Sequence, residues 1–147
     1  MDSTILFSVI ISVVGIGLTA YYAKHSKKIA HEQMLKQLFT EFNHRYDLLN
    51  TFLSRIEQEC PTKEQFLKHE QAEMLRLKVV DYFCLCAEEF FWYQHKGRID
   101  LIIWNSWQSG MNYWYRIPTI KYLWDEEVKS NGKSTYYITN SKEFFEG

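Results

Sequence analysis

Histidine and carboxylate side chains are the first candidates for chemistry in this 147-residue chain, and their spacing restricts what they can do. Glu41 and His44 are three residues apart, which places a carboxylate and an imidazole on one face of a helix. A di-iron bundle needs two such pairs and two further inward-facing glutamates. The sequence has one pair, so we interpret it as part of a solvent-exposed helix face and predict no metal and no cofactor.

A second carboxylate pair, Glu88 and Glu89, precedes a run of aromatic residues. A pair of this kind can serve as acid and base in catalysis. Beside an aromatic core, however, a carboxylate more often accepts a hydrogen bond from tryptophan or tyrosine. We therefore predict that Glu89 is such an acceptor.

Ribonucleases of the HEPN type need an arginine followed by a histidine, with four to six residues between them. In such a pair the histidine moves a proton and the arginine stabilises the charge that develops on the phosphate. None of the arginines has a histidine at this spacing; they are Arg45, Arg55, Arg76, Arg98 and Arg116. We predict that the chain is not an enzyme, unless an arginine and a histidine meet from distant segments.

Small and hydroxyl-bearing residues recur in the otherwise apolar stretch from residue 4 to residue 23. At about 100° per residue they fall within about 80° of one helix face; they are Thr4, Ser8, Ser12, Gly15 and Thr19. Three interpretations follow. The stripe is a seam between membrane helices, it lines a polar pore inside a ring of helices, or each hydroxyl bonds to a carbonyl one turn back and needs no partner.

The same stretch is long enough to cross a bilayer. From Ser3 to Ala23 the chain carries no charge, and 21 helical residues extend about 31 Å, which matches the hydrocarbon core. A cleaved signal peptide would need a basic start and a small-residue cleavage site. We predict a transmembrane span over residues 1–23, in contact with membrane lipid.

Positive residues set the expected orientation of this span. Lys24, Lys27 and Lys28 follow it directly, and lysine-rich flanks stay in the cytoplasm and attract anionic lipid. We therefore expect a single-pass protein of the bacterial inner membrane, with its N-terminus outside and the remaining chain in the cytoplasm.

The remaining chain reads as a small all-α domain, predicted over residues 24–129 and followed by a tail over residues 130–147. Apolar residues recur at spacings of 4 and 3, the pattern of a heptad seam within one bundle or between subunits; they are Leu35, Phe39, Phe42, Tyr46, Leu49, Leu53 and Ile56. This first helix is predicted to end before Pro61. We predict a fold in which the transmembrane helix continues into a cytoplasmic helical bundle that assembles into a ring.

Three further helices are expected. Thr62 and Gln65 form a capping-box pattern that predicts a second helix up to Lys96. Its predicted buried face is Phe66, Met74, Leu77, Val80, Cys84, Ala87 and Phe91. Asp100 is the predicted N-cap of a third helix, with Trp104, Trp107, Met111 and Trp114 on one face. Pro118 begins a fourth helix to about Lys129, and residues 134–139 are β-prone.

Charge and cysteine content limit the functions further. The net charge is −1 and no basic run lies outside the three lysines, so we predict no direct nucleic-acid partner. The three cysteines, Cys60, Cys84 and Cys86, are interpreted as free thiols in a reducing compartment. No second cysteine pair is present to complete a zinc site.

The layout of a span, a long helix and a small helical domain resembles the membrane-anchored accessory proteins encoded beside type VI-B CRISPR effectors. The segment AEEFFWYQHKGRIDLIIWNSWQSGMNYWYRIP, residues 87–118, is similar to segments of small anchored bacterial proteins, some of them associated with phage defence. The resemblance implies a HEPN-like domain, a ring around a membrane pore, and support of an RNA-guided effector system in antiviral defence. The missing arginine and histidine spacing departs from active HEPN enzymes.

Two functions therefore remain open. In the first, the chain is an inner-membrane protein that oligomerises into a pore and perturbs the membrane during antiviral defence. In the second, it is a membrane-tethered, non-catalytic module that recruits a cytoplasmic partner. The first requires a homo-oligomer, and the second does not.

Overall fold

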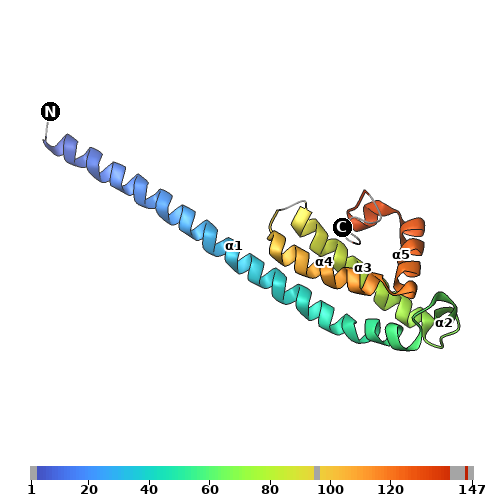
Figure 1. Cartoon of the computed structure of the whole chain (residues 1–147). Helices are drawn as coiled ribbons and strands as arrows, with labels where there is room; N and C mark the ends of the chain where they lie inside the picture. The colour runs from blue at the N-terminus through green and yellow to red at the C-terminus, as the bar shows by residue number, and fades with distance from the viewer. Residues whose placement is uncertain (1–2, 95–96, 140–144, 146–147) are drawn as a thin grey trace. The chain divides into compact units, whose positions relative to one another are not determined.

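A computed structural model describes residues 3–94, 97–139 and 145 of the chain, and these residues contain helices and no strands (Figure 1). The predicted all-α fold is confirmed. Contacts divide the chain into two units, Met1–Phe39 and Thr40–Gly147. Helix α1 (Ser3–Glu59) contributes residues to both units. The domain boundaries predicted at residues 23 and 129 stay predictions.

The first unit exposes its apolar residues. Every side chain described between Thr4 and Ala23 is exposed, including Phe7 and Ile16, with 67% and 71% of their surface accessible. The predicted span begins at Met1 and Asp2, which lie outside the described residues. Among the helical residues that the structure describes, none forms a stretch long and apolar enough to cross a membrane.

The second unit contains the last turns of α1 with α2 (Lys63–Leu67), α3 (Ala72–Gln94), α4 (Leu101–Tyr115), α5 (Pro118–Asn131) and the 3₁₀ helix η1 (Lys133–Tyr136). Helix α3 contacts α4, α5 and η1. The end of α1 at Glu59 is as predicted, because proline at position 61 restricts the residue before it. The carbonyls at this corner accept hydrogen bonds from α5. The Thr119 hydroxyl donates to the Cys60 carbonyl at 2.6 Å, and the Thr119 amide donates to that of Pro61.

The helix predicted from Thr62 to Lys96 is wrong, because the chain breaks it between α2 and α3. The Thr62 and Gln65 capping box is present. After one turn, however, the Lys68 and His69 amides donate to carbonyls three residues back, which tightens the turn and ends α2. Lys96 lies outside the described residues, and Gly97 has the left-handed φ of 53° that suits it after a helix.

The break also rotates the buried face of α3 away from the predicted one. Leu77 and Cys84 are exposed, whereas Leu75, Val79, Tyr82, Phe83 and Cys86 are buried. The prediction assumed one continuous helix, so it placed the buried residues of α3 at helical spacing from Phe66 of α2. A turn between two helices changes which face is buried, so the predicted set is right for Phe66 and Ala87 and wrong for Leu77 and Cys84.

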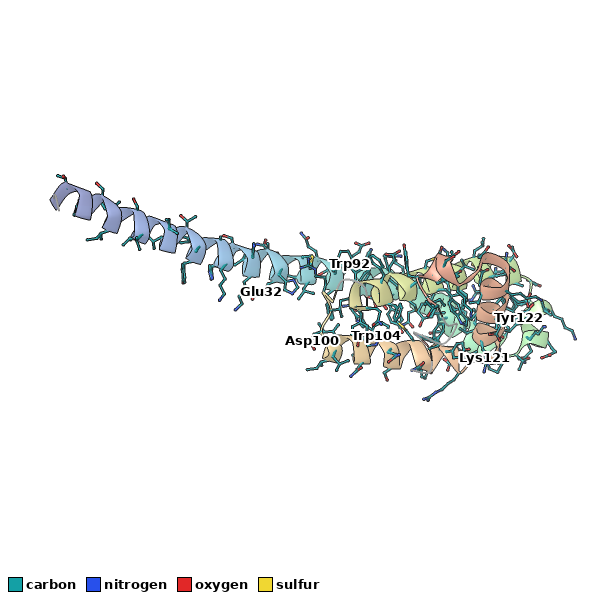
Figure 2. The ribbon with its side chains drawn as sticks, turned by 90° about the horizontal axis from the view of Figure 1, so that it is seen from above. Glu32, Trp92, Asp100, Trp104, Lys121 and Tyr122 are labelled. Atoms are coloured by element: carbon teal, nitrogen blue, oxygen red, sulfur yellow. The ribbon has the colours of Figure 1, made fainter. Side chains whose placement is uncertain are left out.

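Aromatic residues form the centre of the second unit. Trp124 has no accessible surface, and its ring lies 5.0 Å from the rings of Phe83 and Tyr136 and 5.1 Å from that of Phe145. Asp100 caps α4 by accepting from the Ile102 amide at 2.8 Å, and Trp104 lies one turn further on (Figure 2). The predicted face of α4 is confirmed, with Trp104, Met111 and Trp114 buried.

The β-prone reading of residues 134–139 is wrong. Residues Lys133–Tyr136 form η1, and Tyr137 has a left-handed φ of 58°. Buried Glu127 determines this conformation, because it accepts hydrogen bonds from Tyr136 at 3.0 Å, Asn131 at 2.5 Å and Arg76 at 3.4 Å. A strand would remove the Tyr136 hydroxyl from this carboxylate.

Candidate functional site

A small cavity opens between α1, α3 and α4 of the second unit, and it is the candidate functional site. Its volume is about 140 Å³, and it is lined by Tyr46 of α1, Tyr82 and Glu89 of α3, and Ser106 and Trp107 of α4. Residues 82 and 89 are two turns apart on a helix and therefore face the same side. The cavity thus combines a carboxyl group, a serine and three aromatic rings.

Glu89 is the charged side chain of this cavity, and it is 7% exposed. The structure gives its carboxyl group no hydrogen-bonding partner among the described residues. Burial raises the pKa of Glu89 from 4.5 to about 8, which the nearby Arg45 opposes and the nearby Glu88 reinforces. The prediction that Glu89 accepts a hydrogen bond from a tryptophan or tyrosine is therefore wrong, and the group is protonated at neutral pH.

Arg45 forms its ion pair with Glu88, the residue before Glu89, rather than with Glu89 itself. Its guanidinium donates two hydrogen bonds to Glu88, at 2.6 and 3.0 Å, in the bidentate geometry that arginine prefers. This ion pair joins α1 to α3 and is partly exposed, with 31% of the Arg45 side chain accessible. Glu89, one residue on, points into the protein instead.

Two tyrosine hydroxyls add polar groups near this acid. The Tyr82 hydroxyl is buried beside the Cys86 thiol, and burial raises its pKa well above 10. The Tyr46 oxygen accepts a hydrogen bond from the Trp114 indole at 2.9 Å. That bond leaves the Tyr46 hydroxyl hydrogen available to donate.

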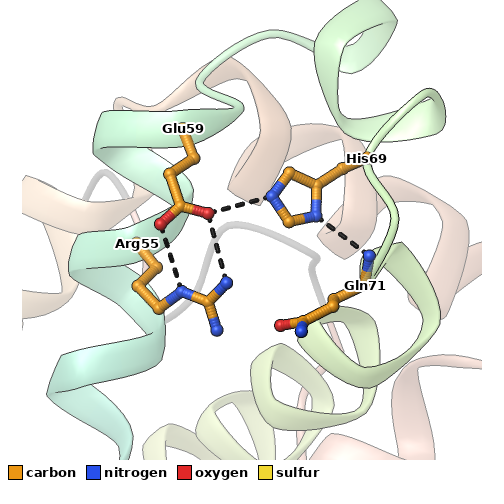
Figure 3. Close-up of polar contacts among 4 residues, drawn as sticks. All are labelled: Arg55, Glu59, His69 and Gln71. Atoms are coloured by element: carbon orange, nitrogen blue, oxygen red, sulfur yellow. Dashed lines mark hydrogen bonds and ion pairs between the residues drawn. The ribbon is translucent and has the colours of Figure 1, made fainter.

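An arginine and a histidine do meet from distant segments, but at another place in the second unit. Arg55 and His69 donate to the same oxygen of Glu59, at 3.2 and 2.9 Å (Figure 3). The Gln71 amide donates to Nδ1 of His69 at 3.1 Å, so that nitrogen carries no proton and Nε2 does. Arg55 also donates from Nε to the other oxygen at 3.3 Å, and the bonds from Arg55 and His69 lower the pKa of Glu59.

This cluster differs from a nuclease pair in its charge. A scissile phosphate is negative, and the Glu59 carboxylate occupies the position between the two donors that a phosphate would need. The cluster instead joins the end of α1 to the turn before α3. We therefore interpret it as a stabilising contact within the bundle.

A larger groove of about 530 Å³ lies between α1 and α3. Its lining includes Leu48, Phe52, Lys78, Asp81 and Cys84. Leu48 is 61% exposed, and Lys78 bonds to Asp81 at 3.0 Å. Apart from Arg45, the residues of α1 that line the groove are apolar, and α3 contributes the ion pair of Lys78 and Asp81.

The predicted stripe lies on the surface of the first unit, and its hydroxyls are satisfied within the helix. Ser8 donates to the Thr4 carbonyl, Ser12 to that of Ser8, and Thr19 to that of Gly15, at 2.8 to 2.9 Å. A side chain added at Gly15 would meet nothing within 4 Å. The hydroxyls of Ser8, Ser12 and Thr19 therefore need no partner outside the helix.

The other predicted residues divide between the two units. Lys24, Lys27 and Lys28 are exposed, and Lys28 lies 3.8 Å from Glu32. In the heptad seam, Phe42, Leu49, Leu53 and Ile56 are buried and Tyr46 is partly buried, so they serve the core of one chain. Leu35 is partly buried, and Phe39 is 46% exposed.

The cysteines are free, as predicted. Cys60 and Cys86 are buried, and burial raises the pKa of both thiols, which makes them poor nucleophiles. Among the described residues, no three histidine, cysteine or acidic side chains come together to hold a metal ion.

Sequence reasoning identified Glu89 but did not connect it with Tyr46, Tyr82 and Trp107. The spacing of Tyr82 and Glu89 on one helix was a usable signal, because it places both on one face. The contribution of α1 and α4 was not visible in the sequence. Comparison of the chain with protein-family models, with curated proteins and with solved structures found no match.

Proposed function

We propose that this chain is a single-pass protein of the bacterial inner membrane, in which residues 1–23 form the membrane span and bring copies of the chain together around a pore. In this proposal the lysines at 24, 27 and 28 lie at the cytoplasmic surface, and the helical bundle is cytoplasmic. Its place in antiviral defence rests on the resemblance to CRISPR-associated anchored proteins alone.

The observation that carries this proposal is the exposed apolar surface of residues 4–23. All of its described side chains are accessible, from Phe7 to Leu18, and none is charged. In water, a helix that is apolar all round must be covered by lipid or by protein. Small residues on one face let helices approach closely in lipid, where no hydrophobic force holds them together.

Two glycines give a matched test of self-association. Gly15 lies within the stripe and Gly17 lies about 200° further round the helix, and an added side chain at either meets nothing within 4 Å of the chain. Leucine at either position should raise helix propensity equally. We expect Gly15→Leu to reduce the mass of the detergent-solubilised assembly and its ion conductance in vesicles, and Gly17→Leu to change neither.

Equal masses and equal conductance for wild type and both variants would contradict the pore. A second variant, with leucine at both Ser8 and Ser12, places bulk on the same face. It should act as Gly15→Leu does while the circular dichroism of the bundle is unchanged.

The satisfied hydroxyls favour a second function, a membrane-tethered module that recruits a cytoplasmic partner. Since Ser8, Ser12 and Thr19 bond to their own helix, lipid can surround a single copy. The groove beside Leu48 and Phe52 offers a surface to a partner. Replacement of residues 1–23 by an unrelated membrane anchor separates the two functions, because the tethered module would keep its activity and the pore would lose it.

A further inference from the structure

The cavity between α1, α3 and α4 holds a buried carboxyl group whose ionised form would have no counter-charge of its own. Glu89 has no hydrogen-bonding partner among the described residues, and the nearest cation, Arg45, is bound in bidentate fashion to Glu88. An acid buried without a partner is costly to the fold. A carboxyl group of this kind that lines a cavity indicates a ligand that would bind to it there.

We propose that this cavity binds a small organic cation, with the Glu89 carboxylate as its counter-charge and the rings of Tyr46, Tyr82 and Trp107 around it. Aromatic rings attract ammonium ions through their electron-rich faces, and a cage of such rings with one acid is typical of sites for alkylated ammonium ions. A cation stabilises the ionised form of Glu89, which burial otherwise disfavours, whereas a neutral ligand leaves the carboxyl group protonated. The proposal depends neither on the predicted span nor on oligomerisation.

The volume of the cavity limits the ligand. About 140 Å³ has room for roughly five water molecules at about 30 Å³ each. A cation of a few carbon atoms fits, whereas a nucleotide or a peptide does not. Tetramethylammonium is therefore a suitable probe, and tert-butanol is a neutral probe of similar shape.

Proton release distinguishes this site from nonspecific binding. Burial holds the pKa of Glu89 at about 8, so the group is protonated at pH 7 in the absence of ligand. A cation binds the ionised form and should release about 0.9 proton per ligand at pH 7 and about 0.1 at pH 9. The groups that face Glu89 are Arg45 and Tyr46 on α1 and Tyr82, Cys86 and Glu88 on α3; the cavity lining from α4 contains no titratable group.

The test is calorimetric titration of the full chain in detergent with tetramethylammonium chloride, in two buffers that differ in ionisation enthalpy. We expect saturable binding with the proton release above, and at least tenfold weaker binding of tert-butanol. Glu89→Gln keeps the shape of the side chain but cannot ionise, so binding should weaken at least tenfold. Glu126→Gln, at an exposed glutamate of α5 outside the cavity, should bind as wild type does.

A second pair of variants keeps the test informative if Glu89→Gln folds poorly. Gly110 of α4 lines the cavity, and a side chain added there meets nothing within 4 Å. Gly110→Leu should fill the cavity and abolish binding, whereas Gly110→Ala should retain most of it. No binding to wild type, equal binding of tert-butanol, or undiminished binding to Gly110→Leu would each overturn the proposal.

Discussion

The two units of this chain satisfy their polar groups in opposite ways. In residues 4–23 the hydroxyls of Ser8, Ser12 and Thr19 bond to carbonyls four residues back, and the apolar side chains remain on the surface. In the second unit the polar groups bond across elements, as Arg45 does with Glu88 over 43 residues of sequence, and the aromatic side chains are buried. The hydroxyls of Ser8, Ser12 and Thr19 need no tertiary contact for their hydrogen bonds, whereas the pair of Arg45 and Glu88 exists only because α1 and α3 pack together.

The largest expected loss of stability comes from a substitution in the aromatic core. Trp124→Ala should lower the free energy of unfolding of the second unit by about 3 to 5 kcal/mol, because it leaves a cavity among Phe83, Tyr136 and Phe145. Denaturant titration of the full chain in detergent, followed by tryptophan fluorescence, measures this loss. Ile16→Ala, at a residue 71% exposed, is the control and should leave the transition unchanged.

The next largest loss of stability is expected at Glu127 of α5, and its neighbour Glu126 provides the control. Glu127→Ala removes the acceptor for Arg76, Asn131 and Tyr136 and should cost about 2 to 3 kcal/mol. It should also speed tryptic cleavage at Lys133, because η1 loses its attachment to α5. Glu126→Ala, at the exposed neighbour, should change the free energy of unfolding by less than about 0.5 kcal/mol. Equal effects of the two substitutions would contradict the role of the buried carboxylate.

Glu89 predicts a dependence of stability on pH. The pKa in the folded chain, about 8, lies above the ordinary 4.5 of the unfolded chain, so the folded state binds the extra proton between these values. Stability from this group is complete below about pH 4.5 and is lost as the pH rises through 8. Integrated between these two pKa values, the loss in the free energy of unfolding should be on the order of 5 kcal/mol, measured by denaturant titration across this range. Glu89→Gln should remove this part of the pH dependence, and an unchanged pH profile would show that the acid is not protonated.

The smallest expected effect is in the first unit. Ser8→Ala together with Ser12→Ala removes two hydroxyls that bond to their own helix and are exposed. The helical content by circular dichroism should stay the same, and the free energy of unfolding of the second unit should change by less than about 0.5 kcal/mol. A loss of helix would mean that these hydroxyls support more than their own turn.

Local signals in the sequence predicted local structure well. Pro61, the Thr62 and Gln65 capping box, Asp100 and Pro118 all mark helix ends where the structure has them. Prediction failed where a local pattern had to be carried across a break. The buried face that begins at Phe66 did not continue past Lys68, because α2 ends there. The β-prone residues from Ser134 fold as η1, in which the Tyr136 hydroxyl donates to Glu127.

The candidate site was predicted in part for the same reason. Tyr82 and Glu89 share a face by their spacing, but Tyr46 and Trp107 join them only through the packing of α1 and α4 on α3. Arg55 and His69 meet at Glu59 because the turn after α2 returns to the end of α1.

The sequence by itself determined the helix ends at Pro61, Thr62, Asp100 and Pro118 and the stripe of small residues on α1, because each depends on contacts within about four residues. Only the tertiary structure decided that Glu89 is buried without a partner while Glu88 holds Arg45, and that Glu127 organises the residues after α5. Burial and long-range pairing depend on which helices pack together. The spacing of residues along the sequence does not show which helices these are.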